Sequence, residues 1–437
     1  MQTKPLKKKI NIISLGCSKN LVDSEVLMGQ LKANRLELAF EEKGTNADIV
    51  VINTCGFIND AKQESIDTIL QYVNAKENGL IENVYVMGCL SERYKDELNK
   101  EIPDIDKYFG VNDIKQIVSE LGGRYKKELI RERELTTPGH YAYLKIAEGC
   151  NRKCTFCAIP LIRGKHISRS EEEIIDEAKR LVNKGVKEII LISQDLTYYG
   201  IDLYKKNNLA RLLNSLSEIG GLEWIRLHYT YPAGFPEEVL YLMNEKPNIC
   251  NYIDIPVQHI NNRILGLMKR GHSKAETMRL LEKIRKVIPD AALRTTLIIG
   301  FPGETQEEYQ ELVRFVKDFE FDRLGVFAYS PEEGTKAFKL KDDVPEQIKN
   351  DRIEQLMGIQ QSLSLKLNKN RIGKTFKTLI DRKENEYYVG RTEYDSPEID
   401  NEVLISSPER PLQIGEFYSV EVSDAEYFDL FGKVSHF

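Results

Sequence analysis

Long hydrophobic runs are missing from this sequence of 437 residues, and none approaches the ~20 apolar residues that a membrane-spanning helix needs. A large excess of either charge is missing too, because 62 Lys and Arg stand against 68 Asp and Glu, a net charge of −6. The apolar fraction of 41% is ordinary for a soluble globular protein, and nothing in the composition signals disorder. We therefore expect no membrane partner, and a folded chain of about three domains.

Cysteine is present seven times, but the chain lacks the dense, even-numbered pattern of a small secreted disulfide scaffold. An odd number of scattered thiols in a long chain favours metal or redox chemistry in a reducing compartment. We therefore expect a cytoplasmic protein. The basic start with its short apolar run, residues 1–17, resembles a signal peptide only superficially and is better interpreted as a first strand.

Three of the cysteines, Cys150, Cys154 and Cys157, form a CxxxCxxC spacing directly after the apolar run 141–147. A structural zinc site needs four ligands, and no fourth cysteine is nearby, although His166 could be recruited. A 4Fe-4S cluster held by three thiolates would leave one iron open for a non-protein ligand. A zinc knuckle or a chance group of buried thiols remains the alternative, since short motifs give false positives.

The N-terminal part, residues 8–124, alternates short apolar runs with charged amphipathic segments, which predicts a doubly wound parallel α/β domain. Cys17, Cys55 and Cys89 each stand at the carboxyl end of a predicted strand, at 9–16, 48–54 and 83–88. Ligands bind at that edge of an open α/β sheet. Singly, each is best interpreted as a small buried thiol. Jointly, their equivalent positions predict a second three-cysteine cluster site.

Residues 136–367 repeat the strand-helix rhythm with longer helices, and Ser170 with Glu173 is typical of a helix start. Six parallel strands are too few for a complete eight-stranded barrel, so a partial, TIM-like (β/α)6 barrel is expected. Cys250 lies within one of these segments and is expected to be an inert core thiol. The six predicted strands are 142–147, 187–193, 223–228, 252–257, 292–299 and 323–328.

The tail, residues 370–437, shows β-type alternation between turns and predicts a small antiparallel β-barrel. It holds 8 Lys and Arg against 14 Asp and Glu, so the whole net charge of −6 is located here. An acidic barrel should repel a phosphate backbone and favour a basic protein partner. The first candidates for such a docking face lie in one turn-rich segment: Asp395, Glu398, Asp400 and Glu402.

The segment 149–169, GCNRKCTFCAIPLIRGKHISR, closely resembles the radical S-adenosylmethionine (SAM) enzymes. The resemblance implies a partial (β/α)6 barrel, a 4Fe-4S cluster whose open iron chelates SAM, and a 5′-deoxyadenosyl radical as oxidant. It also implies SAM contacts after the second, fourth and fifth strands. Many members carry Gly-Gly-Glu after the second strand, where this chain has Ser-Gln-Asp. The implied contacts are Ser193, Gln194, Asp195, Gly300, Pro302 and Gly303; His259, after the fourth strand, is as easily a packing residue, and 300–303 could be only a turn.

The order of three strand-end cysteines, CxxxCxxC and a small barrel resembles the methylthiotransferases over essentially the whole chain, with the tail as a TRAM domain. The strings SLGCSKNLVDSEVLMG, NTCGFINDAKQES and DSPEIDNEV look like the RimO family, which modifies the β-carbon of an aspartate in small-subunit ribosomal protein twelve. The resemblance implies two 4Fe-4S clusters, SAM as both methyl donor and radical source, and a low-potential electron donor. The alternatives are the branch that modifies a tRNA adenosine, and a non-catalytic ribosome- or RNA-binding zinc protein.

Overall fold

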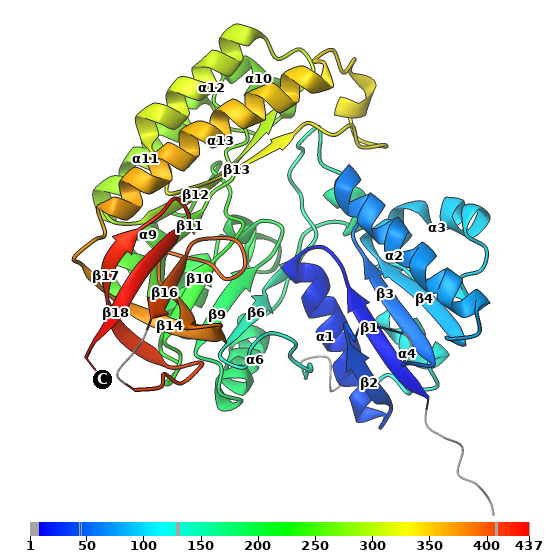
Figure 1. The fold of residues 1–437 in the computed structure, drawn as a ribbon. Coiled ribbons are helices and arrows are strands. Elements are labelled where there is room, and N and C mark those ends of the chain that lie inside the picture. Colours follow the sequence, from blue (N-terminus) through cyan, green and yellow to red (C-terminus); the bar gives the residue numbers. More distant parts are fainter. Residues whose placement is uncertain (1–7, 43, 45, 128–131, 407–409, 437) are drawn as a thin grey trace, which may run out of the picture.

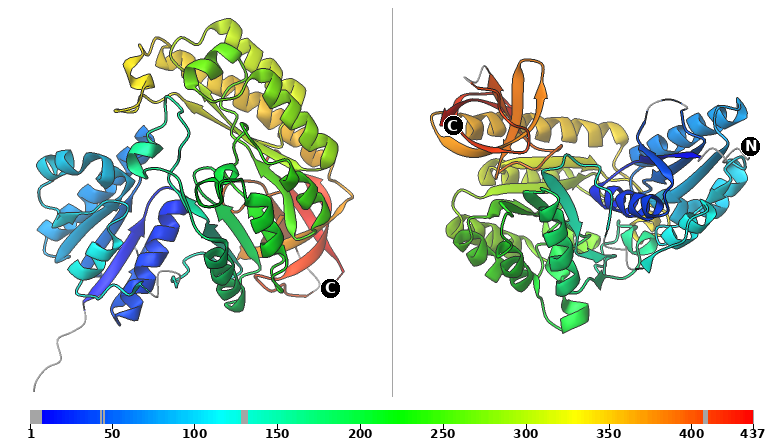
Figure 2. Two further views of the ribbon diagram at one scale, coloured as in Figure 1. Left: turned by 180° about the vertical axis from the view of Figure 1, so that it is seen from behind. Right: turned by 90° about the horizontal axis from the view of Figure 1, so that it is seen from below.

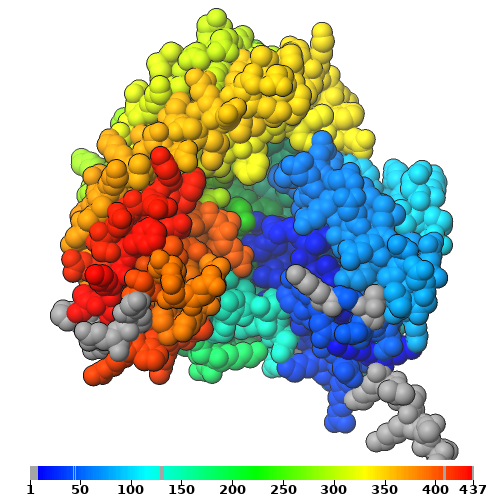
Figure 3. All heavy atoms as spheres, in the orientation of Figure 1, coloured from blue at the N-terminus to red at the C-terminus, as the bar shows by residue number. Residues whose placement is uncertain are grey.

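The computed structural model describes residues 8–42, 44, 46–127, 132–406 and 410–436. The N-terminal α/β unit, in blue and cyan, leans against one side of a larger central unit, and a β-barrel, in orange and red, packs on another side (Figures 1 and 2). The space-filling view shows a hollow in the surface between the N-terminal unit and the barrel (Figure 3). Within the described part of the chain, no helix is long and apolar enough to cross a membrane.

The N-terminal sheet is parallel throughout and has the strand order β2-β1-β3-β4-β5. Helices cover both of its faces: Leu27 and Ile117 pack on one, and Ile69 and Leu98 on the other. The predicted doubly wound sheet is therefore confirmed, although the short edge strands β2 and β5 were not predicted. Its elements are β1 (Lys9–Ser14), α1 (Ser18–Ala33), β2 (Glu37–Phe40), β3 (Ile49–Thr54), α2 (Asn59–Glu77), β4 (Asn83–Gly88), α3 (Cys89–Glu101), β5 (Lys107–Tyr108) and α4 (Ile114–Glu120).

The central sheet holds six parallel strands in the order β13-β12-β11-β10-β9-β6 and stays open between its edge strands. This arrangement confirms the partial barrel predicted from the sequence. The strands are β6 (Tyr141–Lys145), β9 (Glu188–Ile192), β10 (Trp224–Leu227), β11 (Ile249–Asp254), β12 (Ala292–Ile299) and β13 (Arg323–Ala328), so only the fourth is displaced, starting three residues before its predicted start. A two-stranded antiparallel sheet, β7 (Ala147–Glu148) and β8 (Ile167–Ser168), lies beside the cysteine loop.

Helices cover the outer face of this sheet, and apolar side chains from both layers form the largest core of the protein. The Ser170 hydroxyl accepts a hydrogen bond from Glu173 N and begins α6 as predicted, while Thr305 forms a complete capping box at α12. The helices are α5 (Ile159–Ile162), α6 (Glu171–Asn183), α7 (Ile201–Tyr204), α8 (Leu209–Ser217), α9 (Glu238–Glu245), α10 (Asn262–Met268), α11 (Lys274–Val287), α12 (Gln306–Phe319) and α13 (Glu346–Lys369), with short 3₁₀ turns at Leu196–Tyr198 and Ala337–Lys339.

The C-terminal strands close into a five-stranded barrel in the order β14-β15-β16-β18-β17. Four neighbouring pairs are antiparallel, as predicted, but β16 and β18 pair in parallel. The barrel is thus mixed rather than purely antiparallel. Its strands are β14 (Thr375–Glu384), β15 (Tyr387–Thr392), β16 (Glu402–Ser406), β17 (Phe417–Ala425) and β18 (Asp429–His436).

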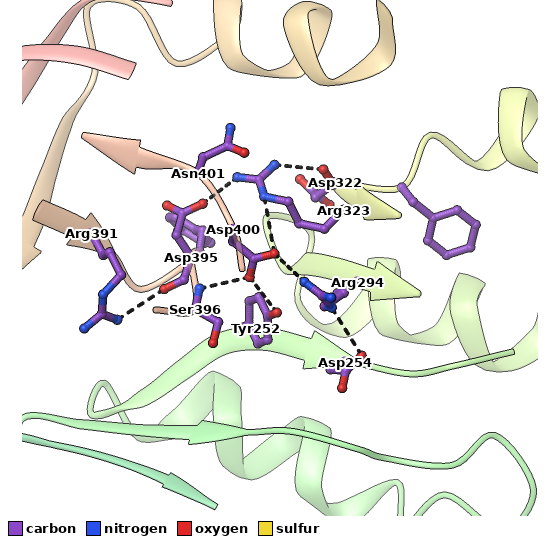
Figure 4. Close-up of polar contacts among 12 residues, drawn as sticks. Tyr252, Asp254, Arg294, Asp322, Arg323, Arg391, Asp395, Ser396, Asp400 and Asn401 are labelled. Atoms are coloured by element: carbon purple, nitrogen blue, oxygen red, sulfur yellow. Dashed lines mark hydrogen bonds and ion pairs between the residues drawn. The ribbon is translucent and has the colours of Figure 1, made fainter. Parts of the chain in front are cut away.

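Buried ion pairs attach this barrel to the central sheet (Figure 4). Asp395 accepts from Arg323 at 2.5 Å, and Asp400 accepts from Arg294 at 2.7 Å. Asp400 also accepts from the Tyr252 hydroxyl at 2.7 Å. The prediction that these two aspartates form a docking face for a partner is therefore wrong: both carboxylates are buried and neutralise arginines of the chain itself.

The other two candidates differ in exposure. Glu402 is partly exposed and pairs with Arg382 at 2.6 Å. Glu398 is exposed, although its carboxylate accepts from the Tyr141 hydroxyl at 3.1 Å. Further exposed acidic side chains lie on other strands and turns of the barrel: Glu384, Glu386, Glu416, Glu421, Asp424 and Glu426.

Replacing Asp395 by Ala should lower the free energy of unfolding by about 3 kcal/mol, because it leaves the buried Arg323 guanidinium without its nearest carboxylate. Denaturant unfolding followed by circular dichroism measures the change. Glu384→Ala is the matched control, since it removes an exposed ion pair to Arg382 and should cost less than about 1 kcal/mol. Equal losses from the two variants would contradict the assignment of Asp395 to the interface.

Candidate functional site

Three adjacent strands of the N-terminal sheet place Cys17, Cys55 and Cys89 at one edge. β1, β3 and β4 are neighbours, and the cysteines follow their carboxyl ends: Cys17 at the N-terminus of α1, Cys55 directly after β3, and Cys89 as the first residue of α3. Gly88 makes the last turn with a φ of 102°, and a Cβ there would lie 2.4 Å from Asn53 Oδ1. The topology brings these three thiols to one edge, with Cys17 exposed and the other two buried.

The second set of cysteines lies on the loop between β7 and α5. Gly149 enters the loop with a φ of 76°, and a Cβ there would lie 2.2 Å from Lys165 O, so only glycine fits. Backbone hydrogen bonds hold both ends: Cys150 N donates to Gly164 O at 3.1 Å, and Thr155 N donates to Met268 O at 3.0 Å. Cys150, Cys154 and Cys157 are therefore presented on a fixed loop and are partly exposed.

Both sets of thiols line one cavity of about 300 Å³ between the N-terminal unit and the central sheet. All six predicted cysteine ligands take part: Cys17, Cys55, Cys89, Cys150, Cys154 and Cys157. Apolar side chains supply much of the remaining wall, including Phe57, Phe156 and Ile162. Two sets that are far apart in the sequence thus share one partly apolar chamber.

Arginines bond to the sulfur atoms from both sides of this cavity. Arg163 donates to Cys89 Sγ at 3.4 Å and is fixed by Asn20 and Asp23, at 2.6 and 2.7 Å. Arg270 donates to Cys154 Sγ at 3.4 Å and also bonds to Pro256 O. Cations in these positions stabilise thiolates and other anionic sulfur in the cavity.

Burial works in the opposite direction on the free thiols. It raises the pKa of Cys89 and of Cys157 to about 12 and that of Cys150 to about 11. Without a bound cation the thiols therefore stay protonated at neutral pH, and metal binding must displace their protons. Within the described residues no three Cys, His, Asp or Glu side chains converge on a single ion. An iron-sulfur cluster binds each thiolate at a different iron, so its ligands need not converge on one point.

The residues predicted to contact SAM after the second central strand have different surroundings. Gln194 lines the cavity and donates to Glu148 at 2.6 Å. Asp195 is buried and accepts from Arg152 Nε at 2.7 Å, while Ser193 is buried and accepts from Asp195 N. Arg152 lines the cavity and Asp195 does not, so Asp195 acts on the cavity only by holding Arg152. Direct contact of these residues with SAM stays a prediction.

Gly300, Pro302 and Gly303 follow the carboxyl end of β12. Gly300 has a φ of 71° and donates its N–H to Glu304 at 2.8 Å. Gly303 N donates to Asp343 at 2.7 Å. None of the three is among the described residues that line the cavity with the cysteines. Their contact with SAM also stays a prediction.

Other residues considered in the sequence have structural surroundings. Cys250 is fully buried beside Trp224 and Tyr252, as expected for an inert core thiol. His166 contacts the Ser168 hydroxyl at 3.0 Å and does not line the cysteine cavity. His259 is buried and accepts from Asn261 N through Nδ1 at 2.9 Å.

Sequence reasoning missed the cations and tyrosines of the cavity. Arg152 and Arg163 lie within the cysteine segment itself, and Lys19 is two residues after Cys17, so closeness to a ligand was the available signal. Tyr229, Tyr231 and Arg270 had no comparable signal, because their approach depends on how the loops after β10 and β11 fold.

Comparison with known families divides the chain in three. Residues 9–110 match the uncharacterized protein family UPF0004, residues 144–316 the radical SAM superfamily, and residues 372–434 the TRAM domain. Each match falls within one of the ranges 8–124, 136–367 and 370–437 that the sequence suggested as domains.

Solved structures share the fold at low sequence identity. The radical SAM methyltransferase TsrM from Kitasatospora setae superposes with a TM-score of 0.56 at 12% identity, over 88% of this chain and 81% of that chain. The cobalamin-dependent radical SAM enzyme OxsB gives a TM-score of 0.52 at 13% identity, over 82% and 56%. These likenesses support the radical SAM fold.

Curated relatives match at much higher identity. The ribosomal protein uS12 methylthiotransferase RimO of Christiangramia forsetii is 55% identical over 99% of this chain and 96% of its own length. The protein of the same name from Flavobacterium johnsoniae is 55% identical over 99% and 100%. With this identity along the whole length, the chain belongs to the RimO family of radical SAM methylthiotransferases.

Proposed function

We propose that this chain attaches a methylthio group to the β-carbon of an aspartate in ribosomal protein uS12. The name of its full-length relatives supports the substrate, and one observation on the chain itself carries the proposal: two sets of three cysteines face the same cavity. Six thiolates in two groups fit two 4Fe-4S clusters, each with one iron left open. Cys150, Cys154 and Cys157 would hold one, and Cys17, Cys55 and Cys89 the other.

The chemistry needs both groups of ligands near one substrate. When bound, the first cluster with SAM supplies a carbon radical strong enough for an unactivated C–H bond, and the second supplies the sulfur. The protein itself positions the ligands and supplies positive charge. Arg270 donates to a sulfur of the CxxxCxxC set, and Arg163 donates to a sulfur of the N-terminal set. Apolar side chains such as Phe57 and Phe156 line the cavity, and an apolar lining limits side reactions of a radical with water.

The rival substrate is a tRNA adenosine. The barrel carries a net charge of −6 and exposes acidic side chains on its strands and turns. This charge disfavours binding of a phosphate backbone. The acidic surface suits a basic ribosomal protein better. This support depends on the exposed acidic side chains of the barrel, because Asp395 and Asp400 form ion pairs with arginines inside the protein. The reaction class further requires a low-potential electron donor, and a ribosomal substrate implies work in the cytoplasm.

Incubation of anaerobically prepared protein with SAM, a strong reductant and either uS12 within the small ribosomal subunit or bulk tRNA tests the proposal. Mass spectrometry of both products should find methylthio on one aspartate of uS12 and an unmodified tRNA. Methylthio-adenosine in the tRNA, with unmodified uS12, would contradict the proposal and show that the chain modifies a tRNA adenosine.

A further inference from the structure

Lys19 is a cavity residue whose charge the rest of the chain leaves uncompensated. It is the second residue of α1, two positions after Cys17, and it lines the cavity shared by the six cysteines. Only 8% of the residue is exposed. A lysine side chain buried to this extent normally has an anionic partner for its ammonium group.

The contact that Lys19 does make is with an aromatic ring. Its Nζ lies 3.1 Å from the centroid of Tyr229, and among the described residues no hydrogen bond or ion pair to Nζ is formed. Such a cation–π contact orients an ammonium but leaves its charge intact. Lys19 is therefore held in place with its N–H donors still available.

Tyr229 is a rigid support for this contact. It has a φ of 62°, which is unusual for a residue with a side chain, and two hydrogen bonds hold it there. Its N–H donates to Asp254 Oδ2 at 2.9 Å, and its carbonyl accepts from Leu196 N at 3.0 Å. Asp254 and His228 are titratable groups close enough to sense the charge of Lys19, and neither forms an ion pair with it.

The remaining cations of the cavity are already engaged. Arg152 bonds to Asp195, Arg163 to Asp23 and Glu148, and Arg270 to Pro256 O and Cys154. Arg270 Nε is also without a partner, but within the described part of the chain Lys19 alone among these cavity cations forms no hydrogen bond or ion pair at all. A negatively charged ligand group entering the cavity has one unengaged cation to meet.

Two amides that line the same cavity also have unused hydrogen-bonding capacity. Gln194 Oε1 and Gln258 Oε1 are buried and have no hydrogen-bond partner in the described structure. Gln258 adopts a φ of 70°, a second strained residue on this wall. Buried polar atoms are normally satisfied, so these two indicate that a polar ligand completes the site.

We propose that Lys19 is the residue that recognises the substrate aspartate, by binding its side-chain carboxylate in the cavity between the two cysteine sets. The inference rests on the proposed function, because an aspartate is the substrate. Binding the carboxylate fixes the adjacent β-carbon, which is the atom to be modified. A neutral asparagine, or an adenine base, offers Lys19 no such charge, so the residue selects for substrate class.

The test measures binding of two synthetic peptides to the holoprotein with both clusters, in the presence of S-adenosylhomocysteine so that no turnover occurs. One peptide carries the uS12 aspartate with its flanking residues, and the other has asparagine in that position. Wild-type protein should prefer the aspartate peptide about tenfold, as a charge-assisted hydrogen bond implies. In Lys19→Met the preference should fall below about twofold, and Lys19→Arg should retain part of it.

Lys107→Met is the matched control, because Lys107 is an exposed, ion-paired lysine on an edge strand of the same sheet. It should keep the full aspartate preference. Iron content and a melting curve verify that each variant is loaded and folded. Lys19→Met protein that keeps the full preference for the aspartate peptide overturns the role of Lys19. So does a variant that loses the preference together with its binding of S-adenosylhomocysteine. A wild-type protein that binds neither peptide but binds tRNA instead contradicts the proposed function itself.

Discussion

Replacing Cys150 by Ala should lower the yield of 5′-deoxyadenosine by at least about a thousandfold, effectively to background. The expectation follows from ligand number, because three thiolates leave no spare ligand and the loss of one releases the cluster's fixed position. Cys150 is also held on its loop by hydrogen bonds to Gly164 O and from Arg152 N. Chromatography of reaction mixtures prepared anaerobically with SAM and reductant measures the product.

The control for this substitution is Cys250→Ala. Cys250 is buried against Trp224 and Tyr252, away from the cavity lined by the other six thiols. Its loss should change stability by about 1 kcal/mol and leave the iron content as it was. A Cys150 variant that still forms 5′-deoxyadenosine, or a Cys250 variant that loses iron, would overturn the assignment of ligands.

Simultaneous replacement of Cys17, Cys55 and Cys89 by Ala should abolish methylthio transfer while cleavage of SAM persists. These thiols stand at the ends of β1, β3 and β4, whereas the CxxxCxxC loop belongs to the central unit and is fixed there by Thr155. The first cluster can therefore form without the N-terminal set. Mass spectrometry of uS12 and chromatography of 5′-deoxyadenosine, from the same incubations, follow the two activities separately.

The single replacement Arg163→Met serves as a companion variant. It keeps all six thiols but removes the guanidinium that donates to Cys89 Sγ. Its transfer activity should fall with less effect on SAM cleavage. If the triple variant still transfers methylthio groups, or loses SAM cleavage although the CxxxCxxC cluster is present, the division of labour between the two sets is wrong.

Strand positions and the cysteine sets could be predicted because both depend on short-range patterns. Apolar runs followed by amphipathic segments identify parallel strands, and a cysteine directly after such a run must lie at the ligand-binding edge. The one displaced strand, β11, shows the limit. Its start at Ile249 is set by pairing with Ile225 on β10, and no local pattern encodes a neighbour's register.

The meeting of both cysteine sets in one cavity could not be predicted with the same certainty, because it depends on packing between units. Arg163 illustrates the reason: its guanidinium joins Asn20 and Asp23 of the N-terminal unit to Glu148 of the central unit. Asn20 and Asp23 are more than a hundred residues away from Arg163 in the sequence. A single buried arginine has no periodicity that would reveal such partners.

The acidic tail was misjudged for a related reason. A charge count treats every carboxylate as if it faced solvent, although a buried one is normally paired. Asp395 and Asp400 pair with Arg323 and Arg294 of the central sheet, so they hold the barrel in place. Charge composition gives the net charge of the barrel but not which of its carboxylates face solvent.

Iron and acid-labile sulfide analysis of anaerobically prepared protein tests the central claim most directly, namely that the six cavity thiols hold two separate clusters. The wild-type chain should contain about eight irons and eight sulfides, and the variant lacking Cys17, Cys55 and Cys89 about four of each. A wild-type chain with only about four irons, or a colourless chain that contains zinc instead, would contradict the claim.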